Sequence, residues 1–283
     1  MPELPEVETV RRGLNTLTVN KTFEGGEVLL PRTLAYPLSV DKFVPCLQGL
    51  AIAEWQRRGK YLLAQLANDE QEHQGYLGIH LRMTGQLLWT QQTEKLQKHT
   101  RIRFFFKDNQ ELRFVDTRTF GKVWLVTDQP QVQNIITGLK KLGPEPFSEE
   151  FSIAYFTNRL SKSGRNIKTF LLDQNVVAGI GNIYADEALF KSKIHPQTIA
   201  NKLNSKQIKS LHQAIIIVLQ TAIDQGGTTF SDFLNLLGVN GNYGNSALVY
   251  GRKGEPCRVC QTPIAKIKLG GRSTHFCPQC QPK

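Results

Sequence analysis

The chain lacks several common features, and each absence excludes a class of protein. No apolar run in its 283 residues is long enough to span a bilayer, which excludes an ordinary membrane-spanning helix. Its first residues are acidic rather than basic and then apolar, so no secretory signal peptide is visible. It has no internal repeat and no low-complexity tract. We therefore expect a globular, cytoplasmic protein with no membrane partner.

Acidic side chains are scarce relative to basic ones. The 24 Asp and Glu residues are outnumbered by 35 Lys and Arg residues, which gives a formal net charge of +11 and a pI of about 9.5. An excess of this size favours a polyanionic partner, either nucleic acid or an anionic membrane surface. Nucleic acid is the better candidate in a chain without membrane or secretion signals. A basic surface kept only for solubility is the weaker interpretation.

Cysteine is rare and unevenly distributed. The chain has five cysteines. Cys46 stands alone and is expected to be a small buried residue. The other four form two Cys-x-x-Cys pairs near the C-terminus, Cys257 with Cys260 and Cys277 with Cys280. This spacing is typical of a closed four-thiolate zinc site, which is structural because it has no open position for chemistry. Two disulfides are the alternative, disfavoured by the missing secretion signal. We expect one structural zinc ion.

The distribution of apolar residues divides the chain into a β-rich part and a helical part. A helix is expected over 1–15, followed by short strands at 26–30, 61–66, 77–81, 101–106, 112–115 and 122–126. Many short strands separated by turns are typical of a sandwich or a barrel. A Pro/Gly segment at 142–146 indicates a linker. Beyond it, helical periodicity predicts helices at 149–161, 166–174, 182–191, 205–225 and 229–237.

The first residues offer a reactive group. If Met1 is removed, as is usual before a small residue, Pro2 becomes a terminal secondary amine. An α-amino group titrates near ~8, against ~10.4 for lysine, so more of it is unprotonated at neutral pH. Such an amine attacks a carbonyl carbon to form an iminium, and the adjacent Glu3 is placed to manage protons. Taken alone, these residues are better interpreted as an ordinary helix start.

Several unrelated motifs occur in one order along the chain. They are Met1–Glu8, Arg57–Leu62, His80–Gly85, Lys98–His99, Asp116–Gly121, Leu142–Pro146, Gly179–Ala185, Gln225–Thr229 and Val249–Cys257. Together they make the chain resemble the bacterial formamidopyrimidine-DNA glycosylases, which excise oxidised purines such as 8-oxoguanine from DNA. Motifs of different chemistry in one register are more specific than any one of them.

The resemblance implies a multidomain α+β fold. Its parts are an N-terminal two-layered β-sandwich with flanking helices, a helix–two-turns–helix domain and a C-terminal zinc-finger β-hairpin. This order agrees with the strands and helices expected above. We place the catalytic N-domain at 1–133, a linker at 134–150, the DNA-binding domain with its lesion-recognition loop at 151–248, and the zinc finger at 249–283.

The resemblance also implies catalytic roles. Pro2 would attack C1′ of the damaged nucleotide, expel the base and form a Schiff base, while Glu3 would donate or shuttle the proton. Lys60 would be the general acid in β-elimination. Arg272, at the tip of the zinc hairpin, would assist δ-elimination, which leaves a one-nucleotide gap. The implied enzyme is a bifunctional DNA glycosylase and abasic-site lyase of base excision repair. Without the resemblance, Lys60 would be a solvated strand-edge lysine and Arg272 a plain phosphate contact.

Three residues match those with which the family fills the space left by an extruded nucleotide: Met83, Arg118 and Phe120. Met83 is flexible and apolar, Arg118 can hydrogen-bond the orphaned cytosine, and Phe120 can wedge into the base step. Ordinary core packing is the alternative for Met83 and Phe120. Flanking Gly85 and Gly121 favour exposed loops instead.

His99, Lys168 and Asn182 match residues that lie near the DNA backbone in the family. The chain departs from the family pattern at Thr117 and Thr119, where Pro and Arg are common. These departures leave Arg118 in place but remove a source of stiffness from its loop.

Two alternatives remain open. An endonuclease VIII-type enzyme shares the scaffold but prefers oxidised pyrimidines, and that group typically has Gly where this chain has Leu4. A non-catalytic damage-binding protein would keep the scaffold without forming a covalent intermediate. The segment Gly238–Asn245 departs from the commonest family form, so the sequence does not rank the lesions. The expected partner is double-stranded DNA with oxidised purines or abasic sites, bound by a monomer that is nucleoid-associated when on DNA.

Overall fold

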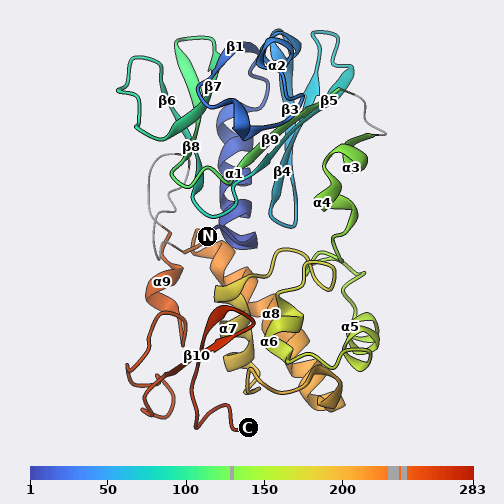
Figure 1. The fold of residues 1–283 in the computed structure, drawn as a ribbon, viewed down its shortest axis with the longest axis vertical. Helices are drawn as coiled ribbons and strands as arrows, with labels where there is room; N and C mark the ends of the chain where they lie inside the picture. Colours follow the sequence, from blue (N-terminus) through green and yellow to red (C-terminus); the bar gives the residue numbers. More distant parts are fainter. Residues whose placement is uncertain (128–130, 229–235, 237–240) are drawn as a thin grey trace. The chain divides into compact units, whose positions relative to one another are not determined.

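The structure is a computed structural model that describes residues 1–127, 131–228, 236 and 241–283. The chain separates into two compact units, one formed by Met1–Lys140 with Gly226–Gly241 and the other by Lys141–Gln225 with Asn242–Lys283 (Figure 1). Among the described residues, no helix has both the length and the apolar character needed to cross a membrane.

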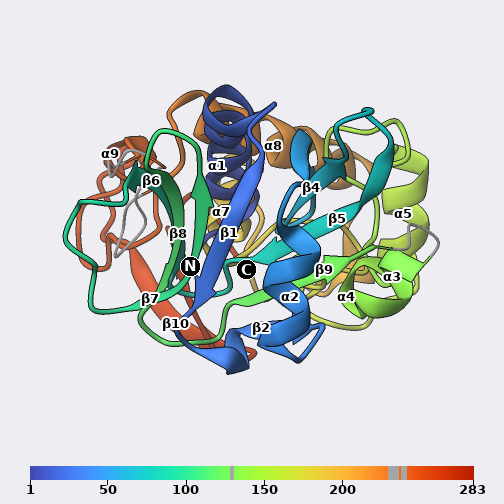
Figure 2. The same cartoon turned by 90° about the horizontal axis from the view of Figure 1, so that it is seen from above.

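The first unit contains a β-sandwich of two sheets (Figure 2). One sheet has four strands in the order β1-β7-β8-β6, and the other has five in the order β2-β9-β5-β4-β3. The strands are β1 (Phe23–Val28), β2 (Leu34–Tyr36), β3 (Ala51–Arg58), β4 (Tyr61–Ala67), β5 (His73–His80), β6 (Gly85–Gln91), β7 (Thr100–Phe106), β8 (Gln110–Asp116) and β9 (Lys122–Val126). Neighbouring strands are antiparallel except for the parallel pair β2 and β9.

Alternation along the strands builds the core between the sheets. In β7 the side chains of Ile102, Phe104 and Phe106 are buried, while the residues between them are only partly covered. This period of two is what a strand with one core-facing side requires. Trp55 of β3 belongs to the same apolar cluster.

Helix α1 (Leu4–Thr18) closes the sandwich. Val7, Val10 and Leu14 recur at helical spacing, are fully buried and join the core cluster. Pro5 lies in the first turn, where its missing N–H costs no hydrogen bond. The helix packs against β3 and β4. Among the described residues, this unit also contains α2 (Val40–Leu47), α3 (Val132–Ile135), α4 (Thr137–Lys140) and the 3-10 helix η1 (Pro31–Thr33).

Two loops cross from one sheet to the other at the same end of the sandwich. Residues 81–84 connect β5 to β6, and residues 117–121 connect β8 back to β9. The register confirms the shared end, because His80 pairs with Lys122 in one sheet and Gly85 pairs with Asp116 in the other. His80 also pairs with Tyr61, so the turn between β3 and β4 lies at this end too.

The second unit is helical and ends in a β-hairpin. Its elements are α5 (Ile153–Ser161), α6 (Ile167–Leu171), α7 (Asn182–Lys191), α8 (Ser205–Asp224), α9 (Tyr243–Ser246), β10 (Ala265–Leu269) and β11 (Arg272–Phe276). Asn166 caps α6 and Asn204 caps α8, each accepting a hydrogen bond from a backbone N–H of the first turn. Helices α7 and α8 pack on each other, and α7 also contacts β11.

The expected strands are confirmed with small shifts of their ends, and the four described helices beyond the linker are confirmed as α5 to α8. The helix expected over 1–15 runs from Leu4 to Thr18. The helix expected over 229–237 falls, apart from Leu236, outside the described residues. Burial of Cys46 is wrong: the residue is exposed, because α2 turns Phe43 and Leu47 to the core instead.

Candidate functional site

Pro2 and Glu3 are buried immediately before α1. The backbone N–H of Glu3 donates to Oε2 of Glu6 at 2.8 Å, and Oε1 of Glu6 accepts from the N–H of Thr228 at 2.8 Å. Glu6 therefore fixes the start of the helix from two sides. While Met1 is attached, the nitrogen of Pro2 is an amide, so its amine chemistry begins only when Met1 is removed.

Lys60 lies in the tight turn between β3 and β4. Gly59 before it has φ +56°, a left-handed conformation that glycine adopts without strain. Its carbonyl accepts a hydrogen bond from Nη1 of Arg57 at 3.1 Å. Lys60 thus projects from a turn that the preceding strand holds in place.

His80 is a residue that sequence reasoning did not single out. Its ring meets the ring of Tyr61 edge-on, with centroids 4.4 Å apart. Burial lowers the pKa of His80 to about 3, with smaller contributions from the positive charges of Arg82 and Lys60. The imidazole is therefore neutral at physiological pH, and its Nδ1 accepts from the N–H of Arg82 at 3.0 Å. The positive charge of Lys60 acts on the same ring, so the turn after β3 lies close to His80.

The buried carboxylate of Asp116 organises the two crossing loops. Its Oδ1 accepts from the hydroxyl of Thr84 at 2.5 Å and from the N–H of Arg118 at 3.2 Å. Its Oδ2 accepts from the N–H of Gly121 at 2.7 Å. One side chain therefore joins the turn that carries Met83 to the loop that carries Arg118.

The loop 117–121 presents two large side chains to solvent. Arg118 and Phe120 are exposed, and the guanidinium of Arg118 lies 5.1 Å from the centre of the Phe120 ring. Thr119 has φ +58° and accepts a hydrogen bond from Nη2 of Arg32 at 2.7 Å. Arg32 and Asp116 thus brace this loop from two sides. Met83 is half-buried in the facing turn.

His99 lies beside the same carboxylate residue. Its carbonyl accepts from the N–H of Asp116 at 2.9 Å, and its Nδ1 accepts from Nη2 of Arg101 at 3.1 Å. Arg101 also donates through Nε to the carbonyl of Asp116 at 2.8 Å. The segments that carry Met83, His99, Arg118 and Phe120 thus meet at Asp116.

In the second unit, Lys168 is fully buried and forms an ion pair with Asp186. Its ammonium also donates to the carbonyl of Asn182 at 3.3 Å. The other oxygen of Asp186 accepts from the N–H of His275 in β11 at 2.9 Å. The pair therefore links α6, the start of α7 and the C-terminal hairpin, and its burial gives Lys168 a structural role beside any contact with DNA.

Asn182 and Arg272 are connected through the hairpin. Nδ2 of Asn182, the first residue of α7, donates to the carbonyl of Ser273 at 2.9 Å. Arg272, the neighbour of Ser273, is exposed at the start of β11. Gly270 and Gly271 both have positive φ, as a two-residue hairpin turn requires. The tip of the hairpin is thus anchored to the helix that begins at Asn182.

The four C-terminal cysteines form the metal site expected from their spacing. All four are free thiols, and their sulfur atoms lie within 4.8 Å of one another. The Cys257–Cys280 and Cys260–Cys277 sulfurs are 3.9 Å and 3.4 Å apart. A tetrahedral zinc ion with Zn–S bonds of about 2.3 Å separates its ligands by about 3.8 Å, so the thiols fit one structural zinc ion.

Glu187, one residue after Asp186, is a second acidic residue that sequence reasoning missed. Its carboxylate accepts hydrogen bonds from the backbone N–H groups of Leu248, Val249 and Tyr250 at 2.8 to 2.9 Å. It thereby fixes the backbone of residues 248–250, which precede the first zinc-binding cysteine, Cys257. Neither Asp186 nor Glu187 belongs to a recognisable metal-ligand or catalytic motif. Their spacing in the sequence therefore gave no sign of these contacts.

Comparisons with known proteins match the chain to formamidopyrimidine-DNA glycosylases along its length. Residues 1–123 match the family described as "Formamidopyrimidine-DNA glycosylase N-terminal domain", residues 142–233 match "Formamidopyrimidine-DNA glycosylase H2TH domain", and residues 254–283 match "Zinc finger found in FPG and IleRS". The formamidopyrimidine-DNA glycosylases of Rippkaea orientalis and Acaryochloris marina are 63% and 60% identical, over 99% and 100% of this chain and 100% of each relative.

Solved structures agree. Lactococcus lactis Fpg in complex with DNA containing an abasic site has a TM-score of 0.90 and 39% identity, covering 99% of this chain and 100% of that one. The wild-type Lactococcus lactis Fpg with DNA containing N7-benzyl-Fapy-dG has a TM-score of 0.90 and 40% identity, covering all of both chains. The chain belongs to the formamidopyrimidine-DNA glycosylase family.

Proposed function

We propose that this protein is a bifunctional DNA glycosylase and abasic-site lyase that removes oxidised purines from duplex DNA in base excision repair. The observation that carries the proposal is the placement of Pro2 and Glu3 at the buried start of α1, in a chain that matches its glycosylase relatives from end to end. The complexes of Lactococcus lactis Fpg with abasic and Fapy-dG DNA support lesion-bearing duplex as the partner. We place this activity in the cytoplasm, on the chromosome.

The first step is removal of the damaged base by Pro2. Its free amine attacks C1′, the glycosidic bond breaks, and the base leaves with the bonding electrons and a proton. Opening of the sugar ring gives an iminium between Pro2 and C1′. Glu3 is the proton shuttle of this step, since it is the carboxylate beside the amine.

The second step is strand cleavage. The iminium withdraws electrons and makes the C2′ proton acidic, and loss of that proton expels the 3′-phosphate. We assign Lys60 as the general acid of this β-elimination, because its turn lies at the end of the sandwich where His80 is held neutral. Arg272 supports the δ-elimination that expels the 5′-phosphate, and its cation stabilises the leaving oxygens.

Extrusion of the nucleotide requires other groups to fill the duplex. We assign Met83, Arg118 and Phe120 to this role, because their two loops project from one end of the sandwich and share Asp116 as a support. The half-buried methionine and the exposed aromatic ring suit an apolar wedge. His99, Asn182 and Lys168 act at the DNA backbone, Lys168 through the groups that its ammonium orients.

The test compares two lesions in otherwise identical duplexes, 8-oxoguanine opposite cytosine and thymine glycol opposite adenine. We expect faster single-turnover excision from the 8-oxoguanine duplex, and a covalent adduct when borohydride is present. Because Lactococcus lactis Fpg has also been solved with DNA that contains an oxidised pyrimidine, the rates rather than the mere presence of product are compared. Preference for thymine glycol would favour the endonuclease VIII-type alternative, and binding without an adduct would favour a non-catalytic protein.

A further inference from the structure

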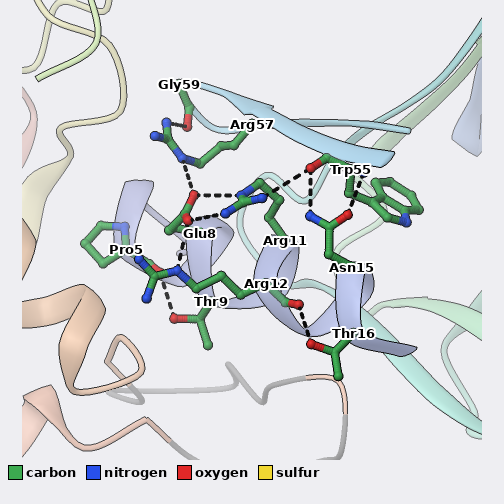
Figure 3. Close-up of polar contacts among 10 residues, drawn as sticks. All are labelled: Pro5, Glu8, Thr9, Arg11, Arg12, Asn15, Thr16, Trp55, Arg57 and Gly59. Carbon is green, nitrogen blue, oxygen red and sulfur yellow. Dashed lines mark hydrogen bonds and ion pairs between the residues drawn. The ribbon is translucent and has the colours of Figure 1, made fainter. Parts of the chain in front are cut away.

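The carboxylate of Glu8, which the proposed mechanism leaves unused, is surrounded by arginines from two elements (Figure 3). It accepts hydrogen bonds from Nε and Nη2 of Arg11 at 3.1 and 2.8 Å, from Nε of Arg12 at 3.0 Å and from Nε of Arg57 at 3.0 Å. Only 8% of Glu8 is exposed. Burial alone would raise the pKa of Glu8, but the hydrogen bonds from these arginines lower it to about 2.

Arg57 joins this carboxylate to the turn that carries Lys60. Its Nε donates to Glu8 on α1, while its Nη1 donates to the carbonyl of Gly59 at 3.1 Å (Figure 3). Gly59 is the left-handed residue of the turn and directly precedes Lys60. The planar guanidinium thus holds two acceptors at a fixed separation, which the point charge of a lysine does not do.

A second set of contacts holds the same helix against the same strand. Nδ2 of Asn15 donates to the carbonyl of Trp55 and Oδ1 of Asn15 accepts from its N–H, both at 2.9 Å. Nη1 of Arg11 reaches the same carbonyl at 3.3 Å. Helix α1 is therefore fixed in register along β3, and the contact of Glu8 with Arg57 extends this clamp to the end of the strand.

We propose that Glu8 and Arg57 are positioning residues for the β-elimination step, because they tie the helix that begins beside Pro2 to the turn that presents Lys60. This inference rests on the proposed function, in which Pro2 carries the opened sugar and Lys60 acts on it. Neither Glu8 nor Arg57 touches the reacting atoms in this account. A displacement of about 1 Å between reacting groups costs up to ~100-fold in rate, so the clamp has a direct kinetic consequence.

The competing explanation is that the cluster only stabilises the fold. A purely structural role would change the amount of folded enzyme and would slow iminium formation and β-elimination by the same factor. A positioning role separates the two steps, since Pro2 stays at the start of α1 while Lys60 loses the support of Gly59. Only a step-resolved measurement distinguishes these explanations.

The experiment uses the full chain and a duplex with a preformed abasic site, so that base removal is bypassed. Borohydride trapping reports iminium formation, and denaturing gels report β-elimination, both under single-turnover conditions. The variants are Arg57→Gln, which removes the charged guanidinium that makes both hydrogen bonds, and Arg57→Lys, which keeps the charge near Glu8. Arg12→Gln is the matched control, because Arg12 donates to the same carboxylate from α1 but its side chain is largely exposed.

We expect both Arg57 variants to slow β-elimination on the order of tenfold while trapping stays within about twofold of the wild type. We expect Arg12→Gln to match the wild type in both steps. Equal loss of both steps, or wild-type β-elimination by Arg57→Lys, would overturn the positioning proposal. Wild-type protein that neither traps nor cuts would instead overturn the proposed function, so the two failures are distinguishable.

Discussion

At the scale of single residues, burial decides which groups can exchange protons near Lys60. His80 is 9% exposed, and its ring is covered on one side by Tyr61. Because burial disfavours the charged imidazolium, the pKa of His80 falls to about 3. The ring therefore serves as a neutral hydrogen-bond acceptor for the backbone N–H of Arg82.

The pKa of His80 has a consequence for stability in acid. Between pH 6.5 and about 3 the unfolded chain binds a proton at this residue and the folded chain does not, so stability falls as pH falls through that window. We expect His80→Gln to remove up to about 1.4 kcal/mol per pH unit of this dependence. Urea unfolding at pH 4.5, 5.5 and 7 measures it. Identical slopes for the variant and the wild type would show that His80 is not held neutral.

At the scale of elements, a buried ion pair ties the C-terminal hairpin to the helices. Asp186 on α7 neutralises Lys168 on α6 and also receives the N–H of His275 on β11. Removing one partner of such a pair leaves an uncompensated buried charge, whereas replacing both with apolar groups can be nearly neutral. The position of the hairpin that carries Arg272 therefore depends on the Lys168–Asp186 ion pair, which contacts β11 at His275 rather than at the tip.

We expect Asp186→Asn to lower the free energy of unfolding by about 3–5 kcal/mol, because it leaves the ammonium of Lys168 buried without its counter-charge. The double variant Lys168→Met with Asp186→Leu should recover most of that loss. Chemical denaturation of the single and double variants measures both effects. A double variant that is no more stable than Asp186→Asn would mean that the two side chains are not coupled.

The zinc site is the other support of the hairpin. We expect Cys280→Ser, or removal of zinc by a chelator, to weaken binding to lesion DNA and to reduce incision, because the four thiolates hold the segments on both sides of β10 and β11. Zinc content and strand cleavage are measured on the same samples. Full incision by protein shown to contain no zinc would contradict this role of the hairpin.

Sequence patterns predicted the helices and strands whose apolar residues recur with a clear period. They did not predict which side chains contact one another. The alternation in β7 and the apolar spacing of Val7, Val10 and Leu14 in α1 were sufficient for those elements. Strands β2, β3 and β6 were not predicted. In β3 the buried Ile52 and Trp55 are three residues apart, because the register shifts between Ile52 and Glu54, so the period-two alternation is broken.

The metal site was predictable because the chemistry of the metal sets the spacing of its ligands, and the Cys-x-x-Cys pairs have that spacing. The resemblance to the family also assigned roles to Pro2 and Lys60, and these roles stay predictions. Glu8 and Asp116 lie inside family motifs, but their contacts with Arg57 and Thr84 could not be predicted because those partners are distant in the sequence. Asp186 lies in no quoted motif, and its partner Lys168 is on another helix. The lesion-recognition loop that follows Thr228 lies largely outside the described residues.

At the scale of the whole molecule, the charge of +11 matches a polyanionic partner. Binding that neutralises phosphates releases counterions, so affinity must fall as salt rises. With about four phosphate contacts, we expect affinity for duplex DNA to fall on the order of a hundredfold between about 50 and 200 mM salt. Fluorescence anisotropy with a labelled duplex measures the slope. A flat response over this range would argue against a basic DNA-binding surface.

The proposed chemistry depends on the amine that Pro2 gains when Met1 is lost. The most direct measurement is mass spectrometry of the protein before and after borohydride trapping on DNA with 8-oxoguanine, followed by peptide mapping of the adduct. We predict that active protein lacks Met1 and that the reduced sugar is attached to the nitrogen of Pro2. An adduct on any other residue, or normal strand cleavage by protein that retains Met1, would contradict the account.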